Sequence, residues 1–158
     1  MIRLAVPEDF TSIMSIYAYA RSFMQETGNP NQWGNHFPPE ELIHNRIRDK
    51  QLFVLEENGT LHGAFAFIID LTYLQIDDGS WLSDAPYGTI HQVASDGTIH
   101  GFFSQIVDYC WAQIPHLRVD THADNQIMQH LILKNGFERR GIIYVLNHSP
   151  RIAFERVK

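Results

Sequence analysis

Two runs of alternating polar side chains carry groups that could move a proton. Tyr87, Thr89 and His91 alternate along a predicted strand, so their side chains share one face. An imidazole has an ordinary pKa of about 6.5 and can take a proton from an amine near neutral pH. His91 is therefore a candidate catalytic base, with Tyr87 beside it as a second candidate catalytic residue. The alternative for His91 is a hydrogen-bonded structural histidine.

Asp120 is the third candidate catalytic residue. It alternates with His122 along a strand predicted over residues 117–122, so these two side chains also share a face. A carboxylate there could orient a cationic amine or act through water. The alternative is a strand-end carboxylate that accepts hydrogen bonds from the backbone or from an arginine.

Aromatic residues in or beside irregular segments could line a substrate pocket. Their rings could form a wall or hold an amine by cation–π contact, or they could instead plug the ends of a sheet. The residues are Trp33, Tyr73, Trp81 and Tyr87.

The segment "SDGTIHGFFS" joins a predicted strand to a predicted helix through glycine. A helix N-terminus presents unpaired N–H groups and a positive dipole end, which together suit a phosphate group. The position of the Phe103 side chain determines whether such a loop can bind a phosphate. Its ring either packs into the core as an ordinary helix residue or fills the space that a phosphate needs.

Hydrophobic periodicity and turn signals predict the element order β-α-α-β-β-β-α-β-α-β-β, and the candidate residues lie on or between these elements. Pro7 precedes an amphipathic helix with apolar residues from Phe10 to Met24, and Asn58-Gly59 sits between two apolar runs as a hairpin turn. A helix follows Gly101, and another ends at Gly136. The predicted fold class is α/β: one domain over residues 1–158, with a mixed, mostly antiparallel sheet of about seven strands flanked by about four helices.

Composition narrows the functional classes. The chain has 12 Lys and Arg against 18 Asp and Glu, a formal charge of −6, which argues against nonspecific nucleic-acid binding. No apolar run approaches the roughly 20 residues that span a bilayer. The single cysteine, Cys110, allows no internal disulfide, so we expect a buried core thiol and a cytoplasmic location. A homodimer is a further expectation, because the apolar segment 151–157 could pair between subunits.

Two motifs in this order resemble the GNAT N-acetyltransferase superfamily over nearly the whole chain. They are "IHQVASDGTIHGFF", set against the family pattern Q/R-x-x-G-x-G/A, and "THADNQIMQHLILKNGF". The resemblance implies a GNAT-like domain that binds acetyl-CoA, with a splayed strand whose amides steady the thioester. It assigns the cofactor contacts to His91, Val93, Ser95, Thr98, Ile99, His100, Gly101, Phe102, Phe103 and Asn125.

Three positions depart from the family pattern. Thr98 stands where the family has Gln or Arg, and Phe103 stands where it has Gly or Ala. Ile132 occupies the position at which the family often carries a tyrosine that protonates the leaving thiolate. Phe103 bears on whether the loop can accept the phosphate of the cofactor, and Ile132 removes the usual proton donor.

The predicted function is acetyl-CoA-dependent N-acetyl transfer to a small amine, directly within a ternary complex. A GNAT fold that has lost catalysis and serves as a ligand- or protein-binding module is the alternative. A metal-dependent hydrolase is a weaker alternative, because no HExxH-like spacing accompanies the candidate ligands His116, Asp120, His122 and Asp124. No metal site is predicted.

Overall fold

The computed structural model describes residues 1–69, 73, 75–145 and 148–158. The described elements lie in the predicted order. The strands are β1 (Ile2–Leu4), β2 (Leu52–Glu57), β3 (Thr60–Ile69), β4 (Gly88–Ser95), β5 (His116–Thr121), β6 (Glu138–Val145) and β7 (Ser149–Val157). The helices are the short 3-10 helix η1 (Pro7–Asp9), α1 (Phe10–Glu26), α2 (Glu40–Arg48), α3 (Phe102–Gln113) and α4 (Gln126–Lys134). The last two residues of the predicted strand 137–147 lie outside the described residues.

The strands form one seven-stranded sheet in the order β1-β2-β3-β4-β5-β7-β6. Its pairings are antiparallel except for β4 with β5, which is parallel and crosses over through α3. This arrangement confirms the predicted mixed α/β fold. Within this chain β7 has β5 on one side and β6 on the other, and the homodimer stays a prediction.

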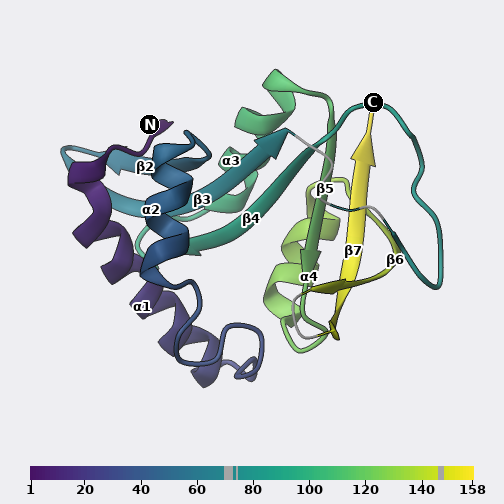
Figure 1. The fold of residues 1–158 in the computed structure, drawn as a ribbon, viewed down its shortest axis with the longest axis horizontal. Coiled ribbons are helices and arrows are strands. Elements are labelled where there is room, and N and C mark those ends of the chain that lie inside the picture. The colour runs from purple at the N-terminus through teal and green to yellow at the C-terminus, as the bar shows by residue number, and fades with distance from the viewer. Residues whose placement is uncertain (70–72, 74, 146–147) are drawn as a thin grey trace.

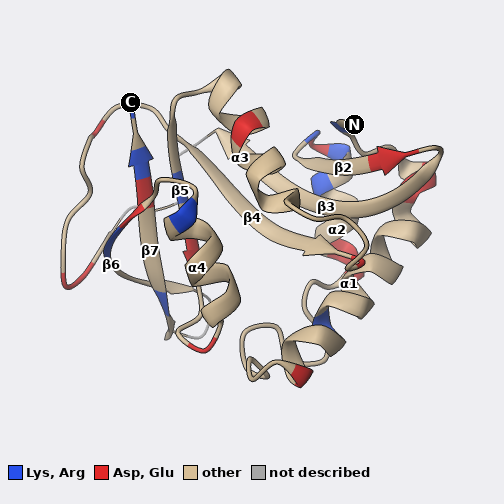
Figure 2. Cartoon of the chain, turned by 180° about the vertical axis from the view of Figure 1, so that it is seen from behind, with Lys and Arg blue, Asp and Glu red and all other residues tan. Residues whose placement is uncertain are grey.

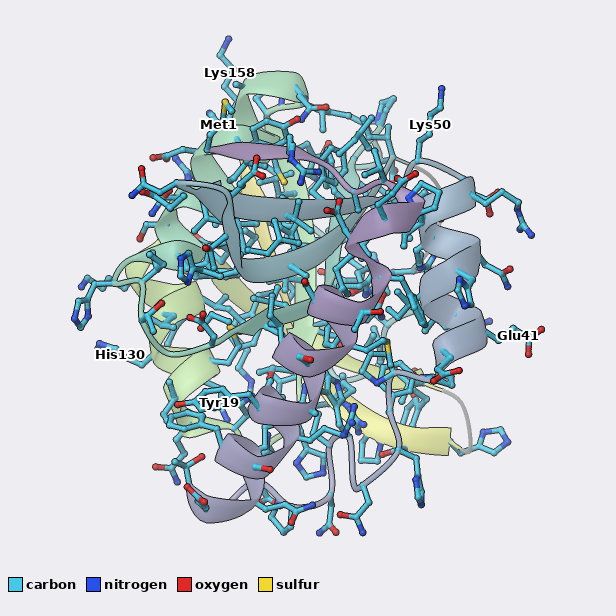
Figure 3. The ribbon with its side chains drawn as sticks, turned by 90° about the vertical axis from the view of Figure 1, so that its left-hand side faces the viewer. Met1, Tyr19, Glu41, Lys50, His130 and Lys158 are labelled. Carbon is cyan, nitrogen blue, oxygen red and sulfur yellow. The ribbon has the colours of Figure 1, made fainter. Side chains whose placement is uncertain are left out.

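Helices cover both faces of the sheet (Figure 3). Glu41 of α2 and His130 of α4, both labelled there, point outward on opposite sides. The alternation of side chains along the strands produces two cores. On β3, Ala64 and Ala66 pack with α1 and α2, whereas Phe65 and Phe67 pack with α3.

A third, smaller cluster lies where a connection rather than a helix covers the sheet. Tyr73 and Trp81, from the connection between β3 and β4, pack there against Tyr87, Ile143 and Ala153. No helix of the described ranges is long and apolar enough to cross a membrane.

Candidate active site

The parallel strands β4 and β5 separate halfway along their length. Their pairing runs from Gly88 with Leu117 to Ile90 with Val119 and goes no further. Figure 1 shows the two strands together at one end and apart at the other, with α4 visible through the gap. The edge of β4 over residues 91–95 therefore has no strand partner on the β5 side. A bound molecule could pair with this backbone.

A bulge in β4 lies within this unpaired stretch. Ala66 of β3 pairs with His91 and Ala64 pairs with Ala94, so two β4 residues stand opposite one β3 residue. Gln92 has a φ of 49°, in the left-handed region that side chains rarely adopt. The hydroxyl of Tyr17, a fully buried residue of α1, donates to the carbonyl oxygen of Gln92 at 2.8 Å and holds the bulge.

His91 and Asp120 meet at the point where the strands part. Because Ile90 pairs with Val119, the next residues on both strands face the α1 and α2 side of the sheet. His91 Nδ1 lies 3.9 Å from Asp120 Oδ2. The hydroxyl of Tyr73 donates to the same oxygen at 2.5 Å, and the Tyr73 and His91 rings meet edge to face at 5.6 Å.

Burial determines the protonation states of His91 and Tyr73. It lowers the pKa of His91 below its ordinary value of 6.5, although the charge of Asp120 acts in the opposite direction. Burial and the neighbouring carboxylate together raise the pKa of Tyr73 well above its usual value. His91 is therefore a neutral imidazole at neutral pH, and its Nε2 is buried without a hydrogen-bond partner. A neutral imidazole with a free nitrogen can accept a proton.

The predicted aromatic residues separate into two groups. Trp81 stacks on Tyr73, and the guanidinium of Arg118 lies 4.0 Å from the Trp81 ring and 3.8 Å from the Tyr87 ring. The protein's own Arg118 thus occupies the cation–π position between Trp81 and Tyr87. The Tyr87 hydroxyl bonds both to the backbone N–H and to the carbonyl oxygen of Tyr73, which fixes Tyr73 in place.

Trp33 lies apart from that stack. It packs against Tyr17 at 5.7 Å, in the core beneath α1. Its neighbour Gln32 accepts a hydrogen bond from Asn125 at 3.0 Å and thereby ties the connection after α1 to α4. Asn125 also caps α4, because its side-chain oxygen accepts from the Met128 N–H. Asn125 thus connects the segment after α1 with the start of α4.

The loop before α3 leaves room for a phosphate. Gly101 has a φ of 70°, and no heavy atom from outside its own stretch of chain lies within 4 Å of where a Cβ would stand. Phe102 and Phe103 are 6% and 4% exposed and belong to the core between the sheet and α3. The Phe103 ring therefore does not fill the space beside Gly101. His100 and Gly101 are exposed at the helix N-terminus, while Ile99 packs on the core.

Charge at this loop differs from what a phosphate site usually offers. Asp96 Oδ1 accepts from the Thr98 N–H at 3.0 Å and from its hydroxyl at 2.6 Å, while Asp96 Oδ2 contacts His62 Nδ1 at 2.8 Å. Residues 51–117 contain no Lys or Arg, and Figure 2 shows α3 and the loop before it without a basic residue. His62 and Asp96 were missed in the sequence, because the contact joins residues 34 positions apart.

Two further residues singled out in the sequence, Cys110 and Ile132, lie in the protein core. Cys110 is buried, as expected, and burial raises the pKa of its thiol to about 12. Ile132 is fully buried in the core. Within the described residues, no group of three or more His, Cys, Asp or Glu side chains is arranged to hold a metal ion. A hollow of about 260 Å³ lined by Lys50, Phe53 and Gln113 contains none of the predicted site residues.

Known structures share this fold. A GNAT-family acetyltransferase from Streptococcus agalactiae is 29% identical, aligns with 100% of this chain and 95% of its own length, and gives a TM-score of 0.86. A putative acetyltransferase from Staphylococcus aureus is 24% identical over 99% of this chain and 98% of its own, with a TM-score of 0.70. AAC(6')-Ib in complex with ribostamycin and coenzyme A is 17% identical over 100% of this chain and 93% of its own, with a TM-score of 0.67. No family model and no curated protein sequence matches the chain.

These similarities confirm the resemblance drawn from the motifs. The chain has the fold of the GNAT N-acetyltransferase superfamily.

Proposed function

We propose that this protein transfers an acetyl group from acetyl-CoA to a small amine, directly within a ternary complex. One observation carries the proposal: β4 and β5 part after Ile90 and Val119, at the point where His91 and Asp120 meet. A gap of this kind gives an extended molecule access from one face of the sheet to acid–base groups on the other. The coenzyme A held by AAC(6')-Ib, which has the same fold, supports the choice of donor.

The residues of the gap fit acetyl-CoA. The unpaired edge of β4 at His91, Val93 and Ser95 would pair with the pantetheine arm. The first turn of α3 would receive the pyrophosphate through its backbone N–H groups, beside the open space at Gly101. Bound acetyl-CoA would supply the thioester carbonyl. Backbone N–H groups at the bulge would then face the oxygen on which negative charge develops.

His91 would remove the proton from the attacking amine. Burial keeps its imidazole neutral at neutral pH, and Asp120 would stabilise the imidazolium that forms. Tyr73 would position Asp120 through its hydrogen bond rather than act on the acceptor. The only cysteine, Cys110, is buried with a raised pKa, which favours direct transfer over an acyl-enzyme.

Two glycine variants test the donor site. Gly101→Trp should abolish the rise in melting temperature that acetyl-CoA gives to the wild type, because the indole fills the open space beside the loop. Gly101→Ala carries the same strain at a φ of 70° with little bulk, and it should keep most of that rise. Equal responses in both variants would remove the loop from the donor site.

His91→Ala tests the base. It should lower the rate of CoA release with an amine acceptor by roughly 10²- to 10⁴-fold while acetyl-CoA affinity changes little. His122→Ala is the matched control, because His122 lies beyond the end of β5 and bonds to the Asp124 N–H. If His91→Ala turns over acceptor at the wild-type rate, the assignment of the base is wrong.

A second candidate function is a non-catalytic binding module. The acidic Asp96 beside Thr98, and the lack of Lys and Arg over residues 51–117, favour it because they weaken the attraction of the loop for phosphate. The same melting experiment separates the two functions. No shift with millimolar acetyl-CoA would favour the binding module.

A further inference from the structure

The connection between β3 and β4 is fixed against the edge strand β6. Asp77 exchanges two backbone hydrogen bonds with Ile142, both of 2.8 Å. Gly79 permits this close approach, because a Cβ on it would overlap the carbonyl oxygen of Arg140. The Arg140 side chain in turn donates through Nε to the Ser80 carbonyl oxygen at 2.8 Å. The connection therefore lies on the sheet in a defined position rather than as a free loop.

Arg118 and Glu155 hold the part of the connection that follows. Both side chains are buried, and Arg118 Nε donates to Glu155 Oε2 at 2.9 Å. Arg118 Nη2 also donates to the Ser83 carbonyl oxygen at 2.7 Å, and Glu155 Oε1 accepts from the Leu82 N–H. The same carboxylate contacts His116 Nε2. One ion pair thus ties β5 and β7 to the connection.

A continuous series of contacts leads from Arg118 to the acid–base pair. Its guanidinium lies 4.0 Å from the centre of the Trp81 ring and 3.8 Å from that of Tyr87. Trp81 stacks on Tyr73 with ring centres 5.7 Å apart. The Tyr87 hydroxyl accepts from the Tyr73 N–H and donates to its carbonyl oxygen, both at 3.2 Å. The Tyr73 hydroxyl then donates to Asp120 Oδ2, so every step of the series is a direct contact.

The Tyr73 hydroxyl and the His91 imidazole share one carboxylate oxygen. Asp120 Oδ2 accepts from the hydroxyl at 2.5 Å, whereas His91 Nδ1 lies 3.9 Å from it, beyond hydrogen-bond distance. A carboxylate that approaches an imidazole more closely favours the imidazolium. The hydroxyl therefore keeps Asp120 near the imidazole without a direct hydrogen bond, which helps the ring to stay neutral. This depends on the position of Tyr73, which lies outside the strands of the sheet.

We propose that Arg118 is a positioning residue of the acid–base pair: through the rings that it contacts, it fixes the Tyr73 hydroxyl on Asp120. The inference rests on the transferase function proposed above. In this role Arg118 contacts neither acceptor nor acetyl-CoA, and its effect reaches the reaction only through Tyr73. A loosened Tyr73 lets Asp120 pair with His91, and a protonated imidazole cannot take the proton of the amine.

The test follows the pKa of His91 in the free protein by nitrogen-15 NMR of the nine histidine rings, with His91→Gln to identify its signals. Tyr73→Phe removes the hydroxyl and should raise this pKa by about 0.5 to 1, because Asp120 then has the imidazolium as its partner. Arg118→Lys keeps the charge beside Glu155 but loses the planar guanidinium, so it should raise the pKa in the same direction. An unchanged pKa in either variant would overturn the inference.

A double variant decides whether Arg118 acts through Tyr73. In the Tyr73→Phe background, Arg118→Lys should add no further rise in the pKa of His91. Equal rises in both backgrounds would mean that Arg118 acts on the pair by another route, against the inference. Tyr87→Phe keeps a ring against Arg118 but removes the hydroxyl that holds Tyr73, so it should raise the pKa even where Arg118→Lys fails to fold. A wild-type pKa of His91 in folded Tyr87→Phe would refute the series of contacts as the route.

The control is Cys110→Ala, which loosens the core under α3 and should leave the pKa of His91 unchanged. A similar rise in this variant would show that destabilisation alone moves the pKa, and the assignment of Arg118 would then fall. All of these variants retain the other titratable or charged groups around the His91–Asp120 pair, which are Tyr17 on α1, Arg46 on α2 and Arg151 on β7.

Activity separates this inference from the function on which it rests. Arg118→Lys and Tyr87→Phe should move the acid limb of the pH profile of kcat/KM to higher pH, while KM for acetyl-CoA stays within about twofold of the wild type. CoA release with a wild-type acid limb in both variants removes the role of Arg118 and leaves the transferase function standing. A raised pKa of His91 without CoA release from any acceptor removes the transferase function and leaves the series of contacts in place.

Discussion

The position of the Phe103 ring can be tested by separating stability from acetyl-CoA binding. The ring is 4% exposed in the core between the sheet and α3. Truncating a buried phenylalanine to alanine costs about 3–5 kcal/mol, a large part of the roughly 5–15 kcal/mol that a domain has in total. Phe103→Leu nearly conserves the volume and should cost less than about 1.5 kcal/mol. The leucine variant therefore stays folded for binding measurements.

Urea denaturation followed by tryptophan fluorescence gives the free energy of unfolding, and calorimetry gives the acetyl-CoA affinity of the native protein. We expect Phe103→Leu to lose about 1 kcal/mol of stability and to bind acetyl-CoA within about threefold of the wild type, because the loop amides stay where they are. His100→Ala, at an exposed position of the same loop, should change stability by less than about 0.5 kcal/mol. Tighter acetyl-CoA binding by Phe103→Leu, with stability unchanged, would place the ring at the phosphate position and refute this reasoning.

Three further predictions follow from buried groups. The acid limb of the pH profile of kcat/KM should report a pKa below 6.5, because burial disfavours the imidazolium of His91. Activity is then lost only as that ring takes up a proton. An acid limb with a pKa at or above 6.5 would exclude His91 as the base. Glu155→Gln should cost about 3–5 kcal/mol in urea denaturation, because it leaves the buried Arg118 without its carboxylate at 2.9 Å. A loss below 1 kcal/mol would mean that this pair contributes little. Tyr17→Phe should cost about 1–3 kcal/mol, because the carbonyl of Gln92 loses its donor. Unchanged unfolding would show that water replaces that hydroxyl.

The elements of the fold were predicted well because their signals are local. Asn58-Gly59 makes the turn between β2 and β3, and Pro7 precedes α1 by way of a short 3-10 helix. Gly136, with a φ of 86°, comes directly after Asn135, the C-cap residue of α4, as predicted. Each of these depends on a few adjacent residues whose backbone preferences are strong.

The candidate site was predicted in part. Alternation along a strand placed His91 on one face, and parallel pairing with β5 brought Asp120 beside it. Tyr73 could be named as an aromatic of the region, but its hydrogen bond to Asp120 joins residues 47 positions apart. Arg118 took the place between Trp81 and Tyr87 that had been considered for a cationic substrate.

The sequence by itself determined the order of helices and strands, the glycine at the α3 N-terminus and the resemblance to the GNAT superfamily, because these lie in short contiguous patterns. Only the tertiary structure decided where β4 and β5 part, and that the Phe103 ring enters the core. Those features depend on which distant residues share a space. Contacts between residues far apart in the sequence depend on the packing of the whole chain, and local conformational propensity does not predict them.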